Sequence, residues 1–305
     1  MELHQLRYFV AAAEAGSISR AAQRCGVAQP SLSQQIRRLE ESLGVRLFDR
    51  LGRGVALTDE GRALVPRARR ILGEVREAEM LVRSEDGEGA GRLSVGAIPT
   101  IAPYLLPGPL ARLLADHPGC DVSVREDYTE RLLERLADTE IDVAIVSTPV
   151  EHDLIETEVI GDEALLVVTP VGHPFAAGNG VSLAALRSEP TIALHEMHCL
   201  GRQISGFCAV KRIAPKVVCH AAQLSTLLEF VRLGMGVSLV PEMASRADAS
   251  RERVYLPVLR GGPRREIALA WRSGRTKPAM ARRLAAFVRQ ELETPATRPR
   301  TTVNI

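Results

Sequence analysis

The sequence lacks any apolar run that approaches the ~20 residues needed for a membrane-spanning helix, and its first residues lack the pattern of a signal peptide. We therefore expect a cytoplasmic protein with no membrane partner. Cysteine is also scarce. Five cysteines among 305 residues do not indicate a framework of structural disulfides in a reducing compartment. Any cysteine pair with a role should be reactive, metal-bound or redox-sensing.

The chain has little net charge, +2 at pH 7, so its total charge does not by itself indicate a nucleic-acid partner. The position of the cations matters more. Nearly all of them are arginines, which offer paired donors to phosphate and guanine. Hydrophobic residues make up 46% of the chain and charged residues 25%, which is ordinary for a globular protein. The length allows two or three compact units.

Three helices are expected at the N-terminus. The first, over residues 4–15, has one apolar face and stops at Gly16. Ser17 caps the second helix, which ends at Gly26. The third begins at Gln29, with its apolar residues facing inward: Leu32, Ile36, Leu39 and Leu43. Two short helices joined by a glycine-containing turn fit a helix-turn-helix when the second is rich in Ser, Gln and Arg.

A β-wing is expected next. Two short strands contain the apolar residues Val45, Leu47, Val55 and Leu57, and the basic tip between them consists of Arg50, Gly52, Arg53 and Gly54. Side chains on the third helix suit base edges in the major groove: Gln29, Pro30, Ser31, Ser33, Gln34 and Arg37. Arg50 and Arg53 are expected to contact phosphate or the minor groove. The alternative, a merely solvated helix face, is weak beside a helix-turn-helix.

A long helix is predicted from Thr58 to about Arg83. Its apolar residues recur at alternating spacings of four and three: Leu64, Ala68, Ile71, Val75, Ala78 and Val82. This is the coiled-coil pattern and indicates dimerisation through the helix. A helix docked on its own domain is the alternative. It is disfavoured because the polar, glycine-rich linker SEDGEGAG follows at 84–91.

From Arg92 onward, strand patterns alternate with helix patterns. Strands are expected at 93–98, 120–126, 142–147, 163–170, 190–195, 216–221, 236–241 and 265–271. Helices are expected near 103–117, 129–138, 182–187, 223–233 and 277–292. Strands separated by helices imply an α/β architecture rich in parallel pairing. The polar tail, 293–305, is expected to be disordered.

The segment from Leu6 to Gly61 resembles the DNA-binding domain of the LysR family of bacterial transcription regulators, position by position and without gaps. The remainder has the length and alternation of that family's effector domain, which resembles a periplasmic binding protein with two subdomains and a cleft. The resemblance implies a homodimer or homotetramer that binds promoter DNA and RNA polymerase. It implies a winged helix-turn-helix at 1–58, a linker helix at 59–86, a hinge at 87–91, and an effector domain at 92–292. Subdomain one would hold 92–162 and 268–292, and subdomain two 163–267.

A narrower resemblance lies in HCLGRQISGFC, from His198 to Cys208, which is similar to the redox loop of the OxyR-type hydrogen-peroxide sensors within this family. IPTIAPYLLP at 98–107 and Thr129 extend it. It implies that peroxide oxidises Cys199 and that Cys208 resolves the product. It also implies that Thr100 and Thr129 line the peroxide site, and the chemistry of a reactive thiol leads us to add His198 and Arg265 to that site. Two positions differ from the subgroup: Gly201-Arg202 replaces the usual Arg-Asp, and Val218 stands where histidine is common.

The chemistry of these residues fits that role. Only a thiolate attacks peroxide, and the cations Arg202 and Arg265, together with His198, are expected to favour it. The sulfenic acid formed at Cys199 would condense with Cys208. If 199–208 is helical, the two Cα atoms lie ~13 Å apart, whereas a disulfide needs them within ~7 Å. Oxidation would then require the segment to refold.

Alternatives remain for the other cysteines and for the function. We interpret Cys25, Cys120 and Cys219 as small buried hydrophobic residues, whereas the polar, glycine-containing sequence around Cys199 and Cys208 predicts polar surroundings for that pair. A zinc or copper(I) site would use His195, His198, Cys199, Cys208, Cys219 and His220, but the spacing does not favour a metal, and no cofactor is expected. A regulator that answers to a small-molecule effector in the cleft is the second hypothesis. A ligand-binding or thiol-peroxidase module is the third, although the chain is not expected to be an enzyme.

Overall fold

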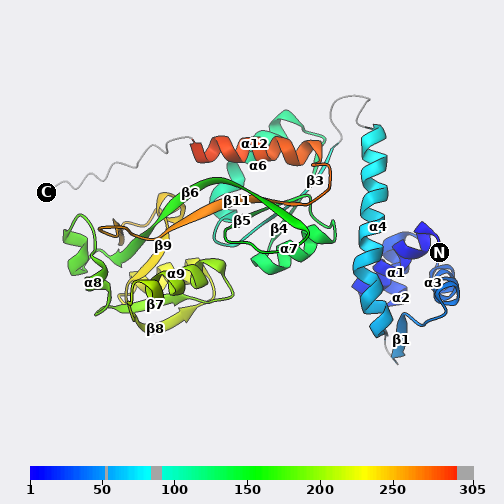
Figure 1. Ribbon diagram of the computed structural model, residues 1–305, viewed down its shortest axis with the longest axis horizontal. Coiled ribbons are helices and arrows are strands. Elements are labelled where there is room, and N and C mark those ends of the chain that lie inside the picture. The colour runs from blue at the N-terminus through cyan, green and yellow to red at the C-terminus, as the bar shows by residue number, and fades with distance from the viewer. Residues whose placement is uncertain (52–53, 84–90, 294–305) are drawn as a thin grey trace. The chain divides into compact units, whose positions relative to one another are not determined.

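The computed structural model describes residues 1–51, 54–83 and 91–293. The chain divides into two compact units, one beginning at Met1 and the other at Gly89 (Figure 1). None of the described helices is both long enough and apolar enough to cross a bilayer. The predicted tail at 293–305 lies almost wholly outside the described residues.

The N-terminal unit begins with three short helices, α1 (Leu3–Ala15), α2 (Ile18–Cys25) and α3 (Gln29–Leu43). Glycines in the left-handed conformation end all three, and the Ser17 side chain accepts a hydrogen bond from the Arg20 N–H at the start of α2. The predicted inward residues Leu32, Ile36 and Leu39 are buried. Leu43 was expected with them, but its side chain is 39% exposed, because it is the last residue of α3.

The wing consists of β1 (Phe48–Leu51) and β2 (Gly54–Leu57), which pair antiparallel. The first strand begins later than predicted. Val45 and Leu47 precede it, because the backbone N–H groups of Leu47 and Phe48 both donate to the Glu40 carboxylate at the end of α3. Leu47 is nevertheless buried, so it anchors the wing to the helical core.

The long helix α4 (Asp59–Arg83) includes Pro66 within its length. Ala68 is fully buried in the core formed by α1 to α3, and Leu64 packs against the same core. At Leu64 and Ala68, α4 is therefore docked on its own domain, as the alternative interpretation expected. Ile71 and Ala78 are exposed, Val75 is half-buried, and the side chain of Val82 lies outside the described residues. Dimerisation through the remaining seam stays a prediction.

The C-terminal unit is built on a seven-stranded sheet, in the order β10-β6-β11-β5-β3-β4 with β9 also on β6. Its strands are β3 (Arg92–Ala97), β4 (Asp121–Glu126), β5 (Val143–Ser147), β6 (Ile155–Pro170), β9 (Ser238–Pro241), β10 (Arg253–Pro257) and β11 (Arg264–Arg272). Strand β3 pairs parallel with β4 and β5, whereas β11 is antiparallel to β5 and β6. The α/β class predicted from the sequence is confirmed. The expected richness in parallel pairing is wrong, because β6 and β11 run antiparallel to each other and to their other neighbours in the sheet.

Two long strands connect the halves of this unit. Strands β6 and β11 run side by side through its length (Figure 1), with a shift in register between Ile267 and Ala268. The predicted strand 163–170 is only the second half of β6. We call the half around β3, β4 and β5 subdomain I, and the half around β9 and β10 subdomain II. The predicted subdomain limits fall within β6 and β11, and as limits they stay a prediction.

Helices complete both subdomains. Subdomain I carries α5 (Ala102–Leu105), α6 (Pro107–Asp116), α7 (Thr129–Ala137) and α12 (Ala279–Glu293). The one helix predicted at 103–117 is thus divided at Leu106. Subdomain II adds the parallel pair β7 (Pro190–Leu194) and β8 (Lys216–Ala221). It also carries η1 (Pro174–Ala177), α8 (Leu183–Leu186), α9 (Cys199–Val210), α10 (Leu224–Arg232) and α11 (Glu242–Ala247).

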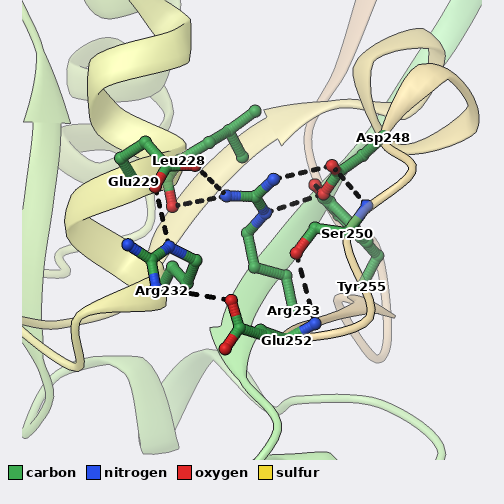
Figure 2. A network of polar contacts seen from close by, with 8 residues as sticks. All are labelled: Leu228, Glu229, Arg232, Asp248, Ser250, Glu252, Arg253 and Tyr255. Atoms are coloured by element: carbon green, nitrogen blue, oxygen red, sulfur yellow. Dashed lines mark hydrogen bonds and ion pairs between the residues drawn. The ribbon is translucent and has the colours of Figure 1, made fainter.

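A polar network fastens β10 to its neighbours in subdomain II (Figure 2). The Arg253 guanidinium donates to both carboxylate oxygens of Asp248 at 2.7 Å and to Glu229 on α10 at 2.9 Å. The Tyr255 hydroxyl donates to Asp248 as well. Burial acts to raise the pKa of Asp248, but the hydrogen bonds from Arg253 and Tyr255 prevail and hold that pKa below its usual value.

Candidate functional site

Both cysteines predicted to react lie on the single helix α9, where Cys199 is the first residue and Cys208 is two residues from the end. Each is 9% exposed. Nine residues turn an α-helix through about two and a half turns, so the two side chains leave opposite faces of α9. Cys199 packs against the core of subdomain I, and Cys208 lines an apolar pocket within subdomain II.

Polar residues from distant parts of the chain surround Cys199. Arg265 on β11 is fully buried. Its guanidinium donates to the Thr100 hydroxyl at 2.8 Å, to the Thr100 carbonyl oxygen at 2.9 Å and to Glu163 on β6 at 2.7 Å. Thr129, the first residue of α7, is also buried, and its hydroxyl has no nitrogen or oxygen partner among the described residues. The fold therefore brings Thr129 and Arg265 to the Cys199 thiol, and Arg265 in turn holds Thr100.

These neighbours act on the acidity of the Cys199 thiol. Burial is the largest influence and raises its pKa above the ordinary value. The charge of Arg265, the hydroxyl of Thr129 and the charge of Arg202 oppose that rise, in that order. The site thus favours the neutral thiol at rest, while Arg265, Thr129 and Arg202 can stabilise a thiolate.

His198, which precedes Cys199 and is predicted for the peroxide site, has partners of its own. It is buried, and its Nε2 lies 2.7 Å from the Ala222 carbonyl oxygen. Because a carbonyl only accepts, Nε2 carries the hydrogen. The ring also meets Tyr128 edge to face, with centroids 4.9 Å apart. His198 therefore fastens the start of α9 to the loop after β8, and it is not among the groups that lower the pKa of Cys199.

The surroundings of Cys208 are apolar, contrary to the polar surroundings expected from the sequence. Burial raises the pKa of the Cys208 thiol, and no charge or hydrogen bond opposes it. Its neighbours around the pocket include Ile192, Leu194 and Ile213. A thiol in such a place is a poor nucleophile until it moves.

Further contacts hold α9 in its helical form. The Gln203 amide donates to the Ser147 hydroxyl at 3.0 Å, and Arg202 pairs with Glu130 at 2.6 Å. The resemblance did not point to Gln203, because its partners are brought near only by the fold. A Cβ at Gly201 would lie 2.7 Å from the carbonyl oxygens of both Leu194 and His195, so only glycine fits there with α9 in this position.

The structure does not support the metal alternative. Across residues 1–51, 54–83 and 91–293, no three His, Cys, Asp or Glu side chains gather as ligands of a metal would. The six residues named for it are therefore not brought together: His195, His198, Cys199, Cys208, Cys219 and His220. Cys120 is buried, and Cys25 and Cys219 are half-buried against apolar clusters. Val218, at the position where the subgroup has histidine, is exposed.

A second candidate surface lies on the N-terminal unit. The predicted DNA-reading residues Gln29, Pro30, Ser31, Gln34 and Arg37 are exposed on α3, and Ser33 is half-buried. A hollow of about 210 Å³ lies between α3 and the wing, and Gln29, Ser33, Arg37, Phe48 and Val55 are among the residues around it. The side chain of Arg50 and the whole of Arg53 lie outside the described residues.

Comparison with known families decides the relationship. Residues 3–62 match the bacterial regulatory helix-turn-helix protein of the lysR family, and residues 86–293 match the LysR substrate binding domain. The chain belongs to the LysR family. The members of this family compared below are described as transcription regulators.

Relatives of this LysR-family chain include the DNA-binding transcriptional dual regulator OxyR of Escherichia coli (strain K12). The two are 34% identical over 294 residues, which cover 96% of each chain. A probable hydrogen peroxide-inducible genes activator of Mycobacterium avium is 37% identical over 287 residues, with 93% of this chain and 92% of the relative covered. Within the LysR family, the chain is of the OxyR type.

Solved structures agree with this assignment. A full-length OxyR variant from Pseudomonas aeruginosa matches with a TM-score of 0.78 at 28% identity, covering 96% of this chain and 98% of that one. Full-length CbnR complexed with its target DNA matches with a TM-score of 0.69 at 27% identity, covering 95% and 100%. The fold expected from the resemblance, a winged helix-turn-helix joined to a two-subdomain effector domain, is confirmed.

Proposed function

We propose that this OxyR-type regulator senses hydrogen peroxide through a reversible disulfide between Cys199 and Cys208. One observation carries the proposal: the two thiols leave opposite faces of one helix, and of the two only Cys199 has a buried cation, Arg265, and a hydroxyl, that of Thr129, acting on it. The printed names of the relatives, which describe activators of hydrogen peroxide-inducible genes, support the same signal.

The reaction assigns a different part to each thiol. The Cys199 thiolate attacks one peroxide oxygen, the S–O bond forms as the O–O bond breaks, and the leaving hydroxide takes a proton to become water. Thr100 and Thr129 can bind the two peroxide oxygens, with Arg265 holding Thr100 in place. The Cys208 thiol then displaces the sulfenic oxygen as a second water. Two thiols and one peroxide give one disulfide and two waters, and a thiol reductant restores the start.

The transmission of the signal follows from the separation along α9. A helical rise of 1.5 Å per residue places the two Cα atoms ~13 Å apart, beyond the ~7 Å that a disulfide spans. The helix must unwind, releasing Gln203 and Arg202 from subdomain I. We propose that this change alters how dimers sit in a homotetramer, with Ile71, Val75 and Ala78 of α4 in the dimer contact, and so alters contacts with RNA polymerase.

The DNA partner is double-stranded promoter DNA, read by Gln29, Ser31, Ser33, Gln34 and Arg37 of α3, next to Pro30. Arg50 and Arg53 would contact the backbone or the minor groove. Such a regulator works in the cytoplasm, where the promoter lies. Cys199 reacts once per cycle, so we do not propose a metabolic enzyme or a resident cofactor.

Mapping disulfides after treatment with a small excess of peroxide tests the proposal. We expect a Cys199–Cys208 crosslink in mass spectra of trypsin-digested protein. The C208S variant should instead accumulate a sulfenic acid at Cys199, and C199S should show neither product. Unmodified thiols in the unaltered chain would contradict peroxide sensing and favour a small-molecule effector.

DNA binding is tested separately by gel shift with the upstream region of the gene. We expect Arg37→Ala to weaken binding to that region more than to random DNA, because base contacts specify. Arg53→Ala should weaken both equally and reduce the salt dependence. Equal losses on both DNAs for Arg37→Ala would contradict base reading by α3.

A further inference from the structure

An apolar pocket of about 310 Å³ lies inside subdomain II, on the face of α9 opposite Cys199. Its walls come from α8, β7, α9, β8 and β9, and they include Cys208. The volume falls at the lower end of the range for small-molecule sites, roughly 300–1,000 Å³. The residues proposed to hold peroxide, Thr100, Thr129 and Arg265, are not part of these walls.

The chemistry of the walls restricts what fits. The buried wall residues carry no charge, and they include Ile192, Leu194, Val237 and Leu239. Ser238, a buried polar wall residue, already donates its hydroxyl to the Ile192 carbonyl oxygen at 2.6 Å. Exposed polar side chains occur among the other wall residues: Glu196, Ser205 and His220. Among the buried walls an ion would lose its hydration without gaining a charged partner, whereas an apolar body gains from leaving water.

We propose that this pocket binds an uncharged, mainly apolar small molecule, about the size of one substituted aromatic ring, and that the bound molecule holds α9 in its helical form. The second part rests on the proposed function. Cys208 is a wall of the pocket, so moving it to Cys199 removes part of the binding site. A ligand and the disulfide therefore exclude one another.

The size of the effect follows from mass action. At a ligand concentration ten times Kd, only about one molecule in eleven has an empty pocket. Disulfide formation should then slow about tenfold, because only the empty form unwinds. By reciprocity, the oxidised protein must bind the ligand more weakly than the reduced protein does.

Binding is tested first, on the reduced full-length chain without peroxide. Titration with 4-fluorotoluene, followed by ¹⁹F NMR, should saturate with a Kd below about 1 mM. Two variants place bulk in the pocket: Ala193→Leu at a half-buried wall residue, and Val217→Phe at a wall residue that is 41% exposed. Each should weaken binding at least tenfold. Ala214→Leu is the matched control, since Ala214 is exposed and outside the walls.

The variants need to be folded for this comparison, and thermal unfolding checks that. If Ala193→Leu unfolds, Val217→Phe provides the test, because the partly exposed Val217 side chain leaves room for a larger one. Binding that does not saturate would overturn the proposed site, as would equal binding by the unaltered chain and by a folded pocket-filling variant.

The coupling is tested second, by timing Cys199–Cys208 formation at fixed peroxide with and without the probe. We expect the probe at ten times Kd to slow the unaltered chain about tenfold and to leave Val217→Phe unaffected. Equal rates with saturating probe would overturn the coupling. Absence of a disulfide even without the probe would overturn the proposed function and the coupling with it, whereas the binding result is decided independently by NMR.

Discussion

The two ends of helix α9 place the same residue type in two different environments. Cys199 and Cys208 are equally exposed, and burial raises the pKa of both thiols. At Cys199, a buried guanidinium and a hydroxyl oppose that rise, whereas at Cys208 the neighbours are aliphatic. Burial alone therefore does not tell which thiol reacts first. The groups that can stabilise a thiolate distinguish them, and the two strongest, Arg265 and Thr129, belong to elements far from α9 in sequence.

Removing Arg265 should have the largest effect on the difference in reactivity between Cys199 and Cys208. In Arg265→Met, the buried Glu163 carboxylate loses its charged partner, so we expect the free energy of unfolding to fall by about 3–5 kcal/mol. The pKa of Cys199 should rise further, slowing its reaction with peroxide about tenfold or more, while alkylation of Cys208 stays unchanged. Denaturant unfolding and stopped-flow kinetics measure both effects.

The neighbouring Arg264 supplies the control for that variant. Arg264 is exposed and pairs with Asp162, so Arg264→Met should change neither quantity appreciably. An unchanged peroxide rate in folded Arg265→Met would show that this guanidinium does not distinguish the two thiols. Arg265→Lys, which keeps the charge, serves if the first variant does not fold.

Asp248→Asn tests whether a loss of stability outside the surroundings of both thiols changes their reactivity. Loss of the charged hydrogen bonds with Arg253 should cost about 1.5–3 kcal/mol, and neither cysteine should change its reactivity. Because the folded-state pKa of Asp248 is below its unfolded value, its contribution is fully present above the unfolded pKa. It is lost as the pH falls through the folded pKa.

Urea unfolding across the acidic range measures this contribution. The Asn variant should lose less stability on acidification than the unaltered chain does. Glu252→Gln, at an exposed residue of the same network, is the control and should have a small effect. A changed rate at Cys199 in Asp248→Asn would mean that global stability, rather than local chemistry, governs the thiol.

Thr129→Val tests the hydroxyl at the Cys199 end. The substitution keeps the shape and removes one hydrogen-bonding group, so we expect the peroxide reaction to slow by about two- to tenfold. Thr169→Val is the matched control, because Thr169 is fully buried with a hydroxyl that also has no partner among the described residues. Equal rates for the two variants would argue against a part for Thr129.

Arg202→Ala should have the smallest effect. Arg202 is the weaker of the two cations that lower the pKa of Cys199, and its side chain is half exposed. The peroxide rate near pH 7 should fall by less than about fivefold, and the pH profile should move to higher pH. Glu130→Gln keeps the charge at Arg202 while removing its ion-pair partner, so it should not move the profile that way. A shift to lower pH in Arg202→Ala would contradict this assignment.

Local signals predicted much of the fold. The helices α1, α2 and α3 end at the glycines that indicate their ends, and α2 begins after the capping residue Ser17. Errors arose where a distant contact outweighs the local pattern. Strand β1 starts late because Glu40 takes the backbone N–H groups of Leu47 and Phe48. The first half of β6 and the whole of β10 were missed, because their stability depends on pairing with β11 and β6.

The candidate site was named largely from resemblance, because the pattern of residues cannot show that Thr100 and Arg265 meet across 165 positions. The partners Glu163 and Gln203 were not found at all. The polar surroundings expected for Cys208 were wrong. Cys208 follows Gly206 and Phe207 along the chain, but α9 directs its side chain toward aliphatic residues of β7 and β9.

The sequence by itself determined the helix-turn-helix, the α/β alternation of the effector domain and the nine-residue spacing of the two cysteines, since each depends on residues close together in the chain. Only the tertiary structure decided which thiol has a buried cation and a hydroxyl acting on it and which one borders an apolar pocket. A helix fixes the angle between its side chains, but the elements that pack on each face determine what those side chains meet.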